Sequence, residues 1–430
     1  MFNLAINKKY ISTIIMTLVF KCLLEFGYFE FVNPSFEYMG FIIDISWTKL
    51  FESYLIVILI LIFLAKLDYY EKPSKIVIYI LFLNLYLPMS SLYWIQDQPR
   101  EYFLVISVSF LILYFIICKS KPISIPNLKE GSHLAFLILL GITVIVYGFL
   151  IATGGLQRMN LNLLNVYSTR QGYVSSSNTL VAYLLPWQAH VVNLTFLTTS
   201  LIKNKKFFIM LTLFIQVLLF SMTNFKSFLF APLVVLGLYF IFKQGFKNSL
   251  LMLMSFLLSI LMSILLILYK INGDIVLLSI FLRRLFFAPA DLNFVYYHYF
   301  SQVEKYKLSH SILSGITDNP YSVSPVVMVA KNVYGEDFSP NVGVFGDAYL
   351  NFGLIGIVVF VIILAFVLVL FDSVARPAPF ILPVTIIAIP SMSLVNSAMF
   401  TCFATHGILF AIFVTWLSSG LFKKNERITL

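Results

Sequence analysis

Charged residues are scarce in this 430-residue chain. Only 11% of the residues are Asp, Glu, Lys or Arg, whereas 60% are hydrophobic. A soluble globular domain has about a quarter charged and roughly half apolar residues. The shortage of charge therefore excludes a soluble globular enzyme and a disordered chain, and it favours a protein with many membrane spans.

Cysteine is almost absent as well. Cys22, Cys118 and Cys402 lie far apart in apolar stretches, so the sequence has neither a disulfide framework nor a metal-ligand spacing. It also has no glycine-rich phosphate loop and no DxD-like pair of acids to hold a metal-bound nucleotide. These absences argue against a nucleotide-sugar donor, and we expect neither a metal nor a cofactor.

The apolar residues gather in twelve runs. A membrane-spanning helix takes about 20 such residues. The first run follows Lys8 and Lys9, contains Lys21 and lacks a small-residue cleavage site, so we expect an uncleaved span. The pattern predicts an all-α polytopic membrane protein with about twelve transmembrane helices in one integral membrane domain, residues 1–430. The runs lie at residues 10–29, 53–67, 76–95, 102–118, 133–153, 178–202, 207–222, 227–242, 249–269, 350–371, 379–399 and 403–422.

The chain carries a net charge of +10, with 29 Lys and Arg against 19 Asp and Glu. In a soluble protein this excess would suggest nucleic acid, but here we interpret it as the positive-inside bias of cytoplasmic loops. With twelve spans, alternate connections hold 17 cations on one side. The other side holds 5, once the long 270–349 loop is left out. We therefore expect both termini in the cytoplasm and no nucleic-acid partner.

Arginine and lysine are distributed differently across this topology. Fifteen lysines are expected inside and six outside, whereas only two arginines are inside and five are outside. The planar guanidinium is preferred where a phosphate or carboxylate must be gripped at two points. The alternative is chance in an arginine-poor chain. The external arginines are Arg100, Arg158, Arg170, Arg283 and Arg284.

Two external segments, 153–177 and 270–349, are long and are expected to form the active-site face, because long connections in compact proteins are usually functional or disordered. The first contains the run Thr-Arg-Gln-Gly-Tyr, in which Arg170, Gln171 and Tyr173 offer hydrogen-bond donors and a ring face. Arg158 lies upstream. Such a set suits an anionic or sugar ligand, and an ordinary polar turn is the alternative.

The second segment contains two apolar, aromatic stretches, Ile275–Phe287 and Leu292–Phe300, which predict short helices on the membrane interface. Arg283 and Arg284 lie within the first stretch. Two arginines near lipid are costly unless they meet an anion. Neighbouring helical positions face different ways, so one is expected to point at the site and the other at headgroups or a structural acid. Lipid headgroups for both are the alternative.

A few other ionisable residues are candidates for chemistry. His310, in a polar stretch of the second segment, is suited to proton transfer. Lys21 and Glu25 stand at i and i+4 in the first span and are expected to pair with each other. His190 and His406 lie within spans, where they could line a cavity or join helices by hydrogen bonds.

The end of the long loop reads Pro-Asn-Val-Gly-Val-Phe-Gly-Asp-Ala-Tyr-Leu-Asn-Phe-Gly-Leu-Ile-Gly over residues 340–356. This run and the Thr-Arg-Gln-Gly-Tyr run resemble the bacterial O-antigen polymerases of the Wzy type and, more loosely, the O-antigen ligases. The chain lacks the histidine that ligases carry before their terminal Gly-x-x-Gly helix, which favours the polymerase. Some polymerases also have, in both loops, an arginine followed by ten residues and a glycine, and none of the four loop arginines Arg158, Arg170, Arg283 and Arg284 has a glycine at that spacing.

The resemblance implies a GT-C-like glycosyltransferase that polymerises undecaprenyl-pyrophosphate-linked oligosaccharide repeat units into surface polysaccharide, without a metal. It implies a bacterial inner membrane location, activity on the periplasmic face, contact with membrane lipids and a chain-length regulator protein as partner. A lipid-linked oligosaccharide flippase and an O-antigen ligase are the alternatives.

The residue roles follow the same expectation. Arg158, Arg170, Arg283 and Arg284, with Gln171 and Tyr173, would bind the pyrophosphate and substrate in place of a metal. Asp347 is the first candidate for the base that removes a proton from the attacking sugar hydroxyl, and His310 is the second. The alternative for Asp347 is a helix cap.

Overall fold

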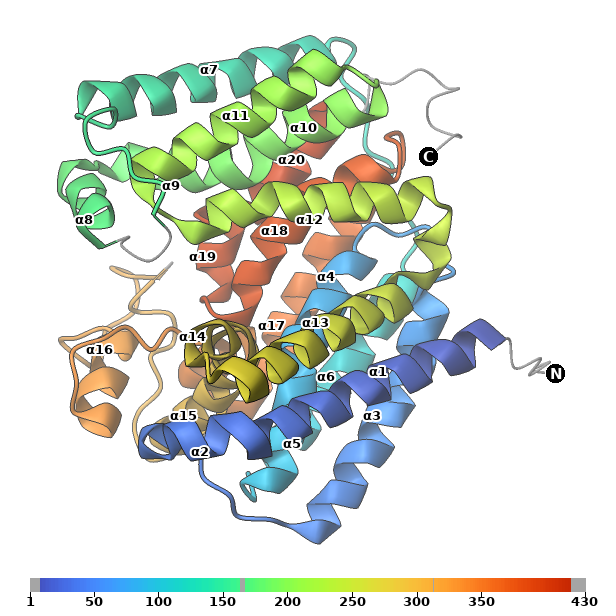
Figure 1. Ribbon diagram of the computed structural model, residues 1–430, viewed down its shortest axis with the longest axis vertical. Coiled ribbons are helices and arrows are strands. Elements are labelled where there is room, and N and C mark those ends of the chain that lie inside the picture. The colour runs from blue at the N-terminus through green and yellow to red at the C-terminus, as the bar shows by residue number, and fades with distance from the viewer. Residues whose placement is uncertain (1–7, 163–166, 312, 419–430) are drawn as a thin grey trace.

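The computed structural model describes residues 8–162, 167–311 and 313–418, and every regular element in these ranges is a helix (Figure 1). Eleven of the described helices are long and apolar enough to cross a membrane. The prediction of an all-α polytopic membrane protein is thus confirmed.

The eleven helices have the following bounds: α1 (Lys8–Gly27), continued by η1 (Tyr28–Val32), α2 (Asn33–Phe36) and η2 (Glu37–Met39); α3 (Trp47–Leu67); α4 (Lys75–Leu81), continued by η3 (Phe82–Tyr86) and α5 (Leu87–Ile95); α6 (Arg100–Lys119); α7 (Gly131–Ala152); α9 (Thr179–Trp187), continued by η4 (Gln188–Val192) and α10 (Asn193–Ile202); α11 (Lys206–Thr223); α12 (Lys226–Lys243); α13 (Leu250–Asn272); α17 (Val344–Ala375); and α19 (Met399–Ala404) with α20 (Ile408–Ser418).

The eleventh expected span, 379–399, is a shorter helix. It comprises α18 (Ile381–Met392) and the 3-10 turn η8 (Ser393–Val395), and it falls below the length of the other eleven. Pro390 lies inside α18, where proline removes a backbone hydrogen bond, and the helix ends five residues later. Nearly all of α18 is buried, because α4, α10, α12 and α20 pack around it. It is therefore an internal helix with little lipid contact.

The first and last described helices have their free ends on the same face. The connections on this face contact one another in series, so that the start of α1, the end of α17 and the end of α20 lie together. The contacts are Tyr10 stacked on Tyr69, Ser74 donating to Asp372, the Ile123 amide donating to Ser373, and Trp416 donating to the Pro126 carbonyl.

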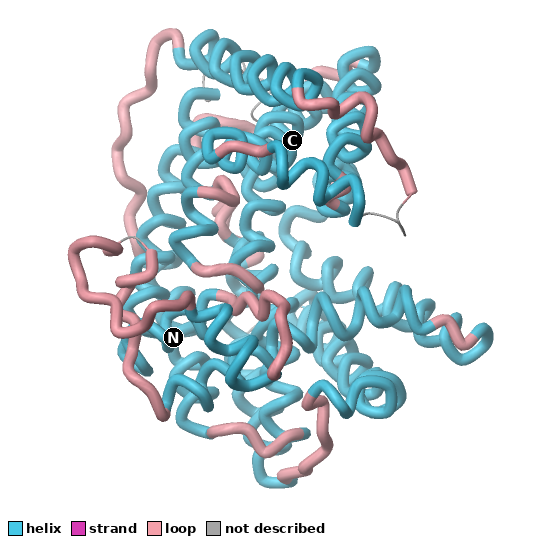
Figure 2. Tube along the Cα trace, turned by 90° about the vertical axis from the view of Figure 1, so that its left-hand side faces the viewer, coloured by secondary structure: helices cyan, strands magenta, loops and turns pink. Residues whose placement is uncertain are grey.

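The segments 153–177 and 270–349 lie on the opposite face, onto which Figure 2 looks. The first contains α8 (Tyr167–Ser176). The second contains α14 (Ile275–Leu278), the π-helical η6 (Ser279–Phe287), α15 (Ala288–Ser301), α16 (Pro325–Val329) and η7 (Ala330–Tyr334). Tyr296 of α15 donates to the Pro340 carbonyl at 2.8 Å, which ties the start of the segment to its end.

The two short interfacial helices expected at 275–287 and 292–300 form one nearly continuous helical segment that enters the bundle. Pro289 does not separate them, because it occupies the first turn of α15, where a missing N–H costs little. Leu282 and Phe286 are fully buried, and the segment packs against α5, η3 and α17. This depth of burial places the arginines of η6 beside the interior of the protein.

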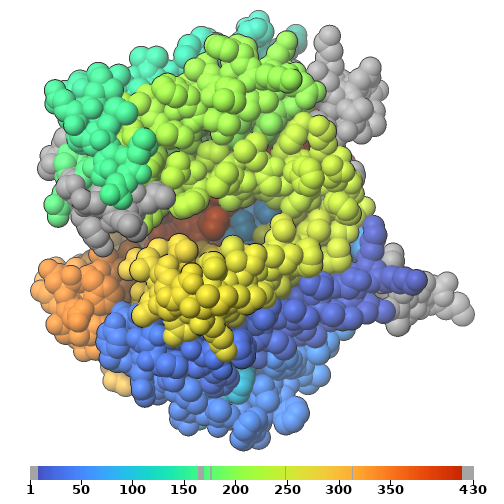
Figure 3. Space-filling view, in the orientation of Figure 1, coloured from blue at the N-terminus to red at the C-terminus, as the bar shows by residue number. Residues whose placement is uncertain are grey.

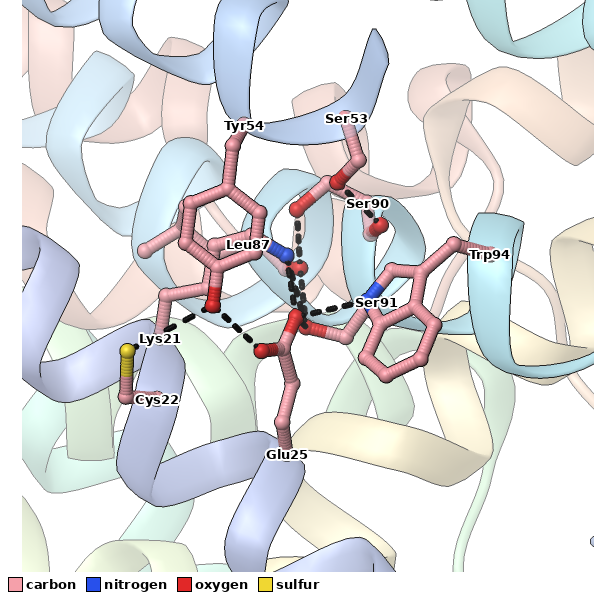
Figure 4. A network of polar contacts seen from close by, with 9 residues as sticks. All are labelled: Lys21, Cys22, Glu25, Ser53, Tyr54, Leu87, Ser90, Ser91 and Trp94. Carbon is pink, nitrogen blue, oxygen red and sulfur yellow. Dashed lines mark hydrogen bonds and ion pairs between the residues drawn. The ribbon is translucent and has the colours of Figure 1, made fainter. Parts of the chain in front are cut away.

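The expected pairing of Lys21 and Glu25 is confirmed, and it forms the centre of a buried polar network (Figure 4). Lys21 Nζ lies 2.5 Å from Glu25 Oε1. The same oxygen accepts from Trp94 Nε1 at 2.8 Å, and Oε2 accepts from the Tyr54 hydroxyl at 2.5 Å. Both charges are satisfied by neighbouring helices, so the network holds α1, α3 and α5 together.

Candidate functional site

A cavity of about 620 Å³ lies between two groups of helices. In Figure 3 it is the hollow below the atoms of α12 and above those of α13 and α14, and red and blue atoms form its floor. It opens sideways between helices, toward the position of surrounding lipid. Mostly apolar side chains line it: Asn84, His190, Ser227, Phe230, Ala231, Val234, Leu261, Phe281, Arg284, Leu285, Ile389, Pro390, Met392, Ser393, Val395, Asn396 and His406.

The cavity lies at the middle level of the spans. Asn84, His190, Val234 and Leu261 each stand near the midpoint of a long apolar helix. Polar groups at this depth are expensive and therefore mark a functional site more often than the same groups in a soluble protein.

Several helices around the cavity are interrupted where they meet it. Asn84 belongs to the π-helical turn η3 and His190 to the π-helical turn η4, which follows Pro186. His406 lies in the break between α19 and α20, next to Gly407, whose φ of +92° suits only glycine. Interruptions of this kind free backbone groups and are tolerated at membrane depth only beside protein or a cavity.

Arg284 is the cation of this cavity. It is exposed and lines the cavity, and no hydrogen bond or ion pair joins it to any residue in the described ranges. Its neighbours Phe281 and Leu285 are apolar. A guanidinium among apolar groups, with no carboxylate from the protein, is available for an anion from outside.

Arg283 faces a different direction. Its Nε donates to Ser279 Oγ at 3.2 Å, and its guanidinium carbon lies 4.4 Å from the centre of the Phe36 ring. Nη1 also lies 3.7 Å from the sulfur of Met39. Arg283 therefore fastens η6 to the outer end of the first span and does not line the cavity.

Two histidines share the cavity with Arg284. His406 Nε2 lies 3.2 Å from Ser397 Oγ, and His190 packs edge-on against Phe228 with centroids 5.2 Å apart. His190 Nε2 is buried and has no hydrogen-bond partner among the described residues. Within the same ranges, no group of three or more His, Cys, Asp or Glu is arranged to hold a metal. The polar chemistry of the cavity is therefore cationic or neutral.

Arg158 and Arg170 hold the 153–177 segment against the turn between α11 and α12. Arg158 donates to the carbonyls of Met222 and Thr153 at 3.2 and 2.8 Å, and burial lowers its pKa. Arg170 donates to the Asn224 carbonyl at 3.2 Å. These guanidinium groups bind backbone oxygens of the protein itself.

Tyr173 and Gln171 complete this segment. Tyr173 is buried, stands edge-on to Phe225 at 5.8 Å and has its pKa raised by burial. The Phe225 ring also receives the Arg170 guanidinium at 5.0 Å. Gln171 is exposed. None of these residues lines the cavity, but Phe225 touches Phe228, which packs on His190.

Asp347 is buried inside the protein. Its Oδ2 accepts from the Met399 amide at 2.8 Å, and Oδ1 accepts from Asn351 Nδ2 at 3.2 Å. The carboxylate thus caps α19, a helix 52 residues later in the chain, and not its own helix. By holding the start of α19 it positions the preceding turn, whose Val395 and Asn396 line the cavity.

The glycine-rich run around Asp347 is explained by close packing. A Cβ on Gly343 would lie 2.2 Å from the Val395 carbonyl oxygen, so no larger residue fits there. Gly353 has φ of +66° and interrupts α17, a conformation that favours glycine. The run brings α17 against the end of α18 and the start of α19.

His310 is not among the residues that line the cavity. It follows α15 in an irregular stretch and packs edge-on against Tyr306 at 4.9 Å. Burial lowers its pKa, which favours the neutral ring. Its Nδ1 is buried and has no hydrogen-bond partner in the described part of the chain.

The structure therefore brings together Arg284, His190 and His406, while the other expected binding residues lie at the outer face. Sequence reasoning did not find Asn84, Ser227 or Asn396. These are single polar residues within apolar runs, and nothing in their spacing distinguishes them from residues that join helices. Comparisons of the chain with protein-family models, curated proteins and solved structures found no match.

Proposed function

We propose that this protein binds polyprenyl-pyrophosphate-linked oligosaccharides in the lateral cavity and transfers the glycan of one onto another, as a repeat-unit polymerase. The observation that carries the proposal is Arg284, a cation that has no partner among the described residues and lies in an otherwise mostly apolar cavity at membrane depth. The similarity of the 340–356 run to O-antigen polymerases supports the polymerising activity.

The ligand chemistry follows from the cavity. An apolar lining with one guanidinium suits an amphiphile that has an anionic head and a hydrocarbon chain. The sideways opening lets the chain remain in lipid while the head meets Arg284. Hydrogen-bonding groups for the head come from His190, His406 and Asn84. The lining contains no carboxylate that would compete with the ligand for them.

In the proposed reaction, a hydroxyl of the acceptor's terminal sugar attacks the anomeric carbon of the donor glycan. The bond from that carbon to the pyrophosphate oxygen breaks, and lipid pyrophosphate leaves with the electron pair. Arg284 would stabilise the negative charge that develops on the leaving group, as an arginine or metal does in other phosphate-releasing sites. The reaction needs no nucleotide.

A flippase for lipid-linked oligosaccharides is the second candidate, and a specific observation favours it. Transporters place substrate sites near the bilayer midplane, at broken helices whose freed backbone groups face the cavity. The turns η3 and η4 and the break at His406 have this arrangement. The same cavity could therefore carry the headgroup across the membrane.

One experiment separates these functions and the ligase alternative. Surface polysaccharide of a strain that lacks the gene would be resolved on a gel, and undecaprenyl-linked glycan would be extracted from the same cells. Loss of the polymerase leaves a single repeat unit on the lipid core. Loss of a ligase leaves none there, with polymer on the carrier, and loss of a flippase leaves none and no periplasmic polymer. Either of the last two patterns would overturn the proposal.

A further inference from the structure

Asp291 is a buried carboxyl group that the proposed reaction has not yet used. It lies in the first turn of α15 and is 8% exposed. No hydrogen bond or ion pair to it is formed by any residue in the ranges that the structure describes. A small part of the residue remains accessible, and Asp291 is not among the residues that line the cavity.

This isolation sets Asp291 apart from the other buried carboxyl groups of the described chain. Glu25 accepts from Lys21, Trp94, Ser91 and Tyr54. Asp68 accepts from the Tyr79 hydroxyl at 3.1 Å and the Leu251 amide at 3.3 Å, and Asp347 from two donors described above. Among these acids Asp291 is the one without a donor from the described residues, so its carboxyl oxygens are available to a molecule that reaches them.

Burial raises the pKa of Asp291 to about 7, because removal from water penalises the charged form. The titratable groups that interact electrostatically with it are Tyr28 of η1 and Tyr334 of η7, both of which are neutral near pH 7. Helix α17 also packs against α15, and its carboxyl group Asp347 interacts electrostatically with Tyr296 and not with Asp291. No cation of the described residues is paired with Asp291, and a carboxyl group in this state can exchange a proton near neutral pH.

The position of Asp291 relates it to Arg284. One helical segment carries both, with Asp291 seven residues after Arg284, a rise of roughly 10 Å along the axis. The segment leads from the cavity toward the outer face, where Tyr297 and His298 of α15 contact Glu101 and Gln98. The anion at Arg284 and a proton acceptor at Asp291 thus lie in the order in which a pyrophosphate and its attached sugar would extend toward water.

We propose that Asp291 is the general base of the proposed transfer, which rests on the proposed function. The Asp291 carboxylate takes the proton from the acceptor hydroxyl as its oxygen bonds to the anomeric carbon. The bond to the pyrophosphate oxygen breaks at the same time, and the proton is released to water afterwards. Asp291 takes this role in place of Asp347, whose two oxygens are occupied as a helix cap.

The test uses full-length protein in lipid vesicles with a lipid-linked repeat unit as both donor and acceptor. Polymer formation would be followed from pH 5 to pH 9. A base must be unprotonated, so the wild-type rate should fall about tenfold per pH unit below about pH 7. Asp291→Asn should lower the rate by about 100-fold or more, abolish this acid limb and leave KM unchanged. Asp291→Glu should retain part of the activity.

Asp337→Asn is the matched control, because Asp337 is an exposed carboxylate of the same external segment. It should keep the wild-type rate and pH profile. Wild-type activity with an unchanged profile in Asp291→Asn would overturn the base assignment while leaving the proposed function intact. Vesicles in which the wild-type protein forms no polymer would instead count against the proposed function. The amount of folded protein in each preparation would be compared by gel filtration, and the Asp291→Glu profile decides if Asp291→Asn fails to fold.

Discussion

Arg284 and Arg283 are adjacent in the sequence, yet their alanine variants should fail in different ways. Arg284 lines the cavity and has no partner in the part of the chain that the structure describes, so Arg284→Ala should impair polymer formation and leave stability almost unchanged. Arg283 stacks on Phe36 and donates to Ser279, so Arg283→Ala should lower stability and affect turnover much less.

The magnitudes follow from these contacts. Removing one group that stabilises a developing oxyanion costs about 100- to 1000-fold in rate, or about 2.7–4 kcal/mol. A substitution that breaks no core packing, hydrogen bond or ion pair changes the free energy of unfolding by at most about 0.5 kcal/mol. This is the expectation for Arg284→Ala. Losing the cation–π contact of Arg283 should cost about 0.5–2 kcal/mol.

Arg284→Lys is the informative intermediate. Lysine keeps the positive charge but loses the planar fork with which arginine grips two phosphate oxygens. We therefore expect a rate between those of wild type and Arg284→Ala. If charge alone mattered, the lysine variant would match wild type, and the preference for arginine on this face would need another cause.

Two measurements on each variant decide the matter. Initial rates of polymer formation would be measured in vesicles, and thermal unfolding would be measured in detergent. The reasoning is refuted if Arg284→Ala polymerises at the wild-type rate, or if Arg283→Ala is the variant with lost turnover and normal stability. Equal loss of both properties in both variants would show that the two side chains do not have separate roles.

Three further outcomes are expected from the fold. Asp347→Ala should destabilise the protein by about 1–3 kcal/mol, because the buried amide of α19 loses its acceptor. Asp347→Asn keeps an oxygen at this place, so it should unfold near the wild-type temperature and polymerise normally. A rate loss of about 100-fold in the asparagine variant would restore Asp347 as the base. Glu25→Ala should lower the free energy of unfolding by about 3–5 kcal/mol, because Lys21 stays buried without its partner. Adding Lys21→Met should recover part of that loss, as measured by thermal unfolding. A double variant no more stable than Glu25→Ala would contradict this explanation. Reporter fusions after Lys205 and after Glu304 should report cytoplasm and periplasm respectively, and exchanged signals would refute the proposed orientation.

Composition and length were sufficient to predict the all-α membrane fold. In a run of about 20 apolar residues, a helix lets the backbone N–H and C=O groups form their hydrogen bonds within the segment, as lipid requires. The i, i+4 spacing of Lys21 and Glu25 was sufficient for their pairing, because these positions lie on one side of a helix. The eleventh run was the exception: its apolar composition matches a span, but Pro390 and its burial among four neighbours make it a short internal helix.

The tertiary structure alone decided which polar residues form a site. Arg284, His190 and His406 come from three segments far apart in the chain and meet only because those segments pack around one cavity. The amide that Asp347 caps lies 52 residues away in the chain. That no described residue donates to Asp291 depends on every element packed around it. Local patterns in sequence record helix faces and lengths, because these repeat over a few residues. Partners across helices depend on packing between distant segments, which no local pattern records.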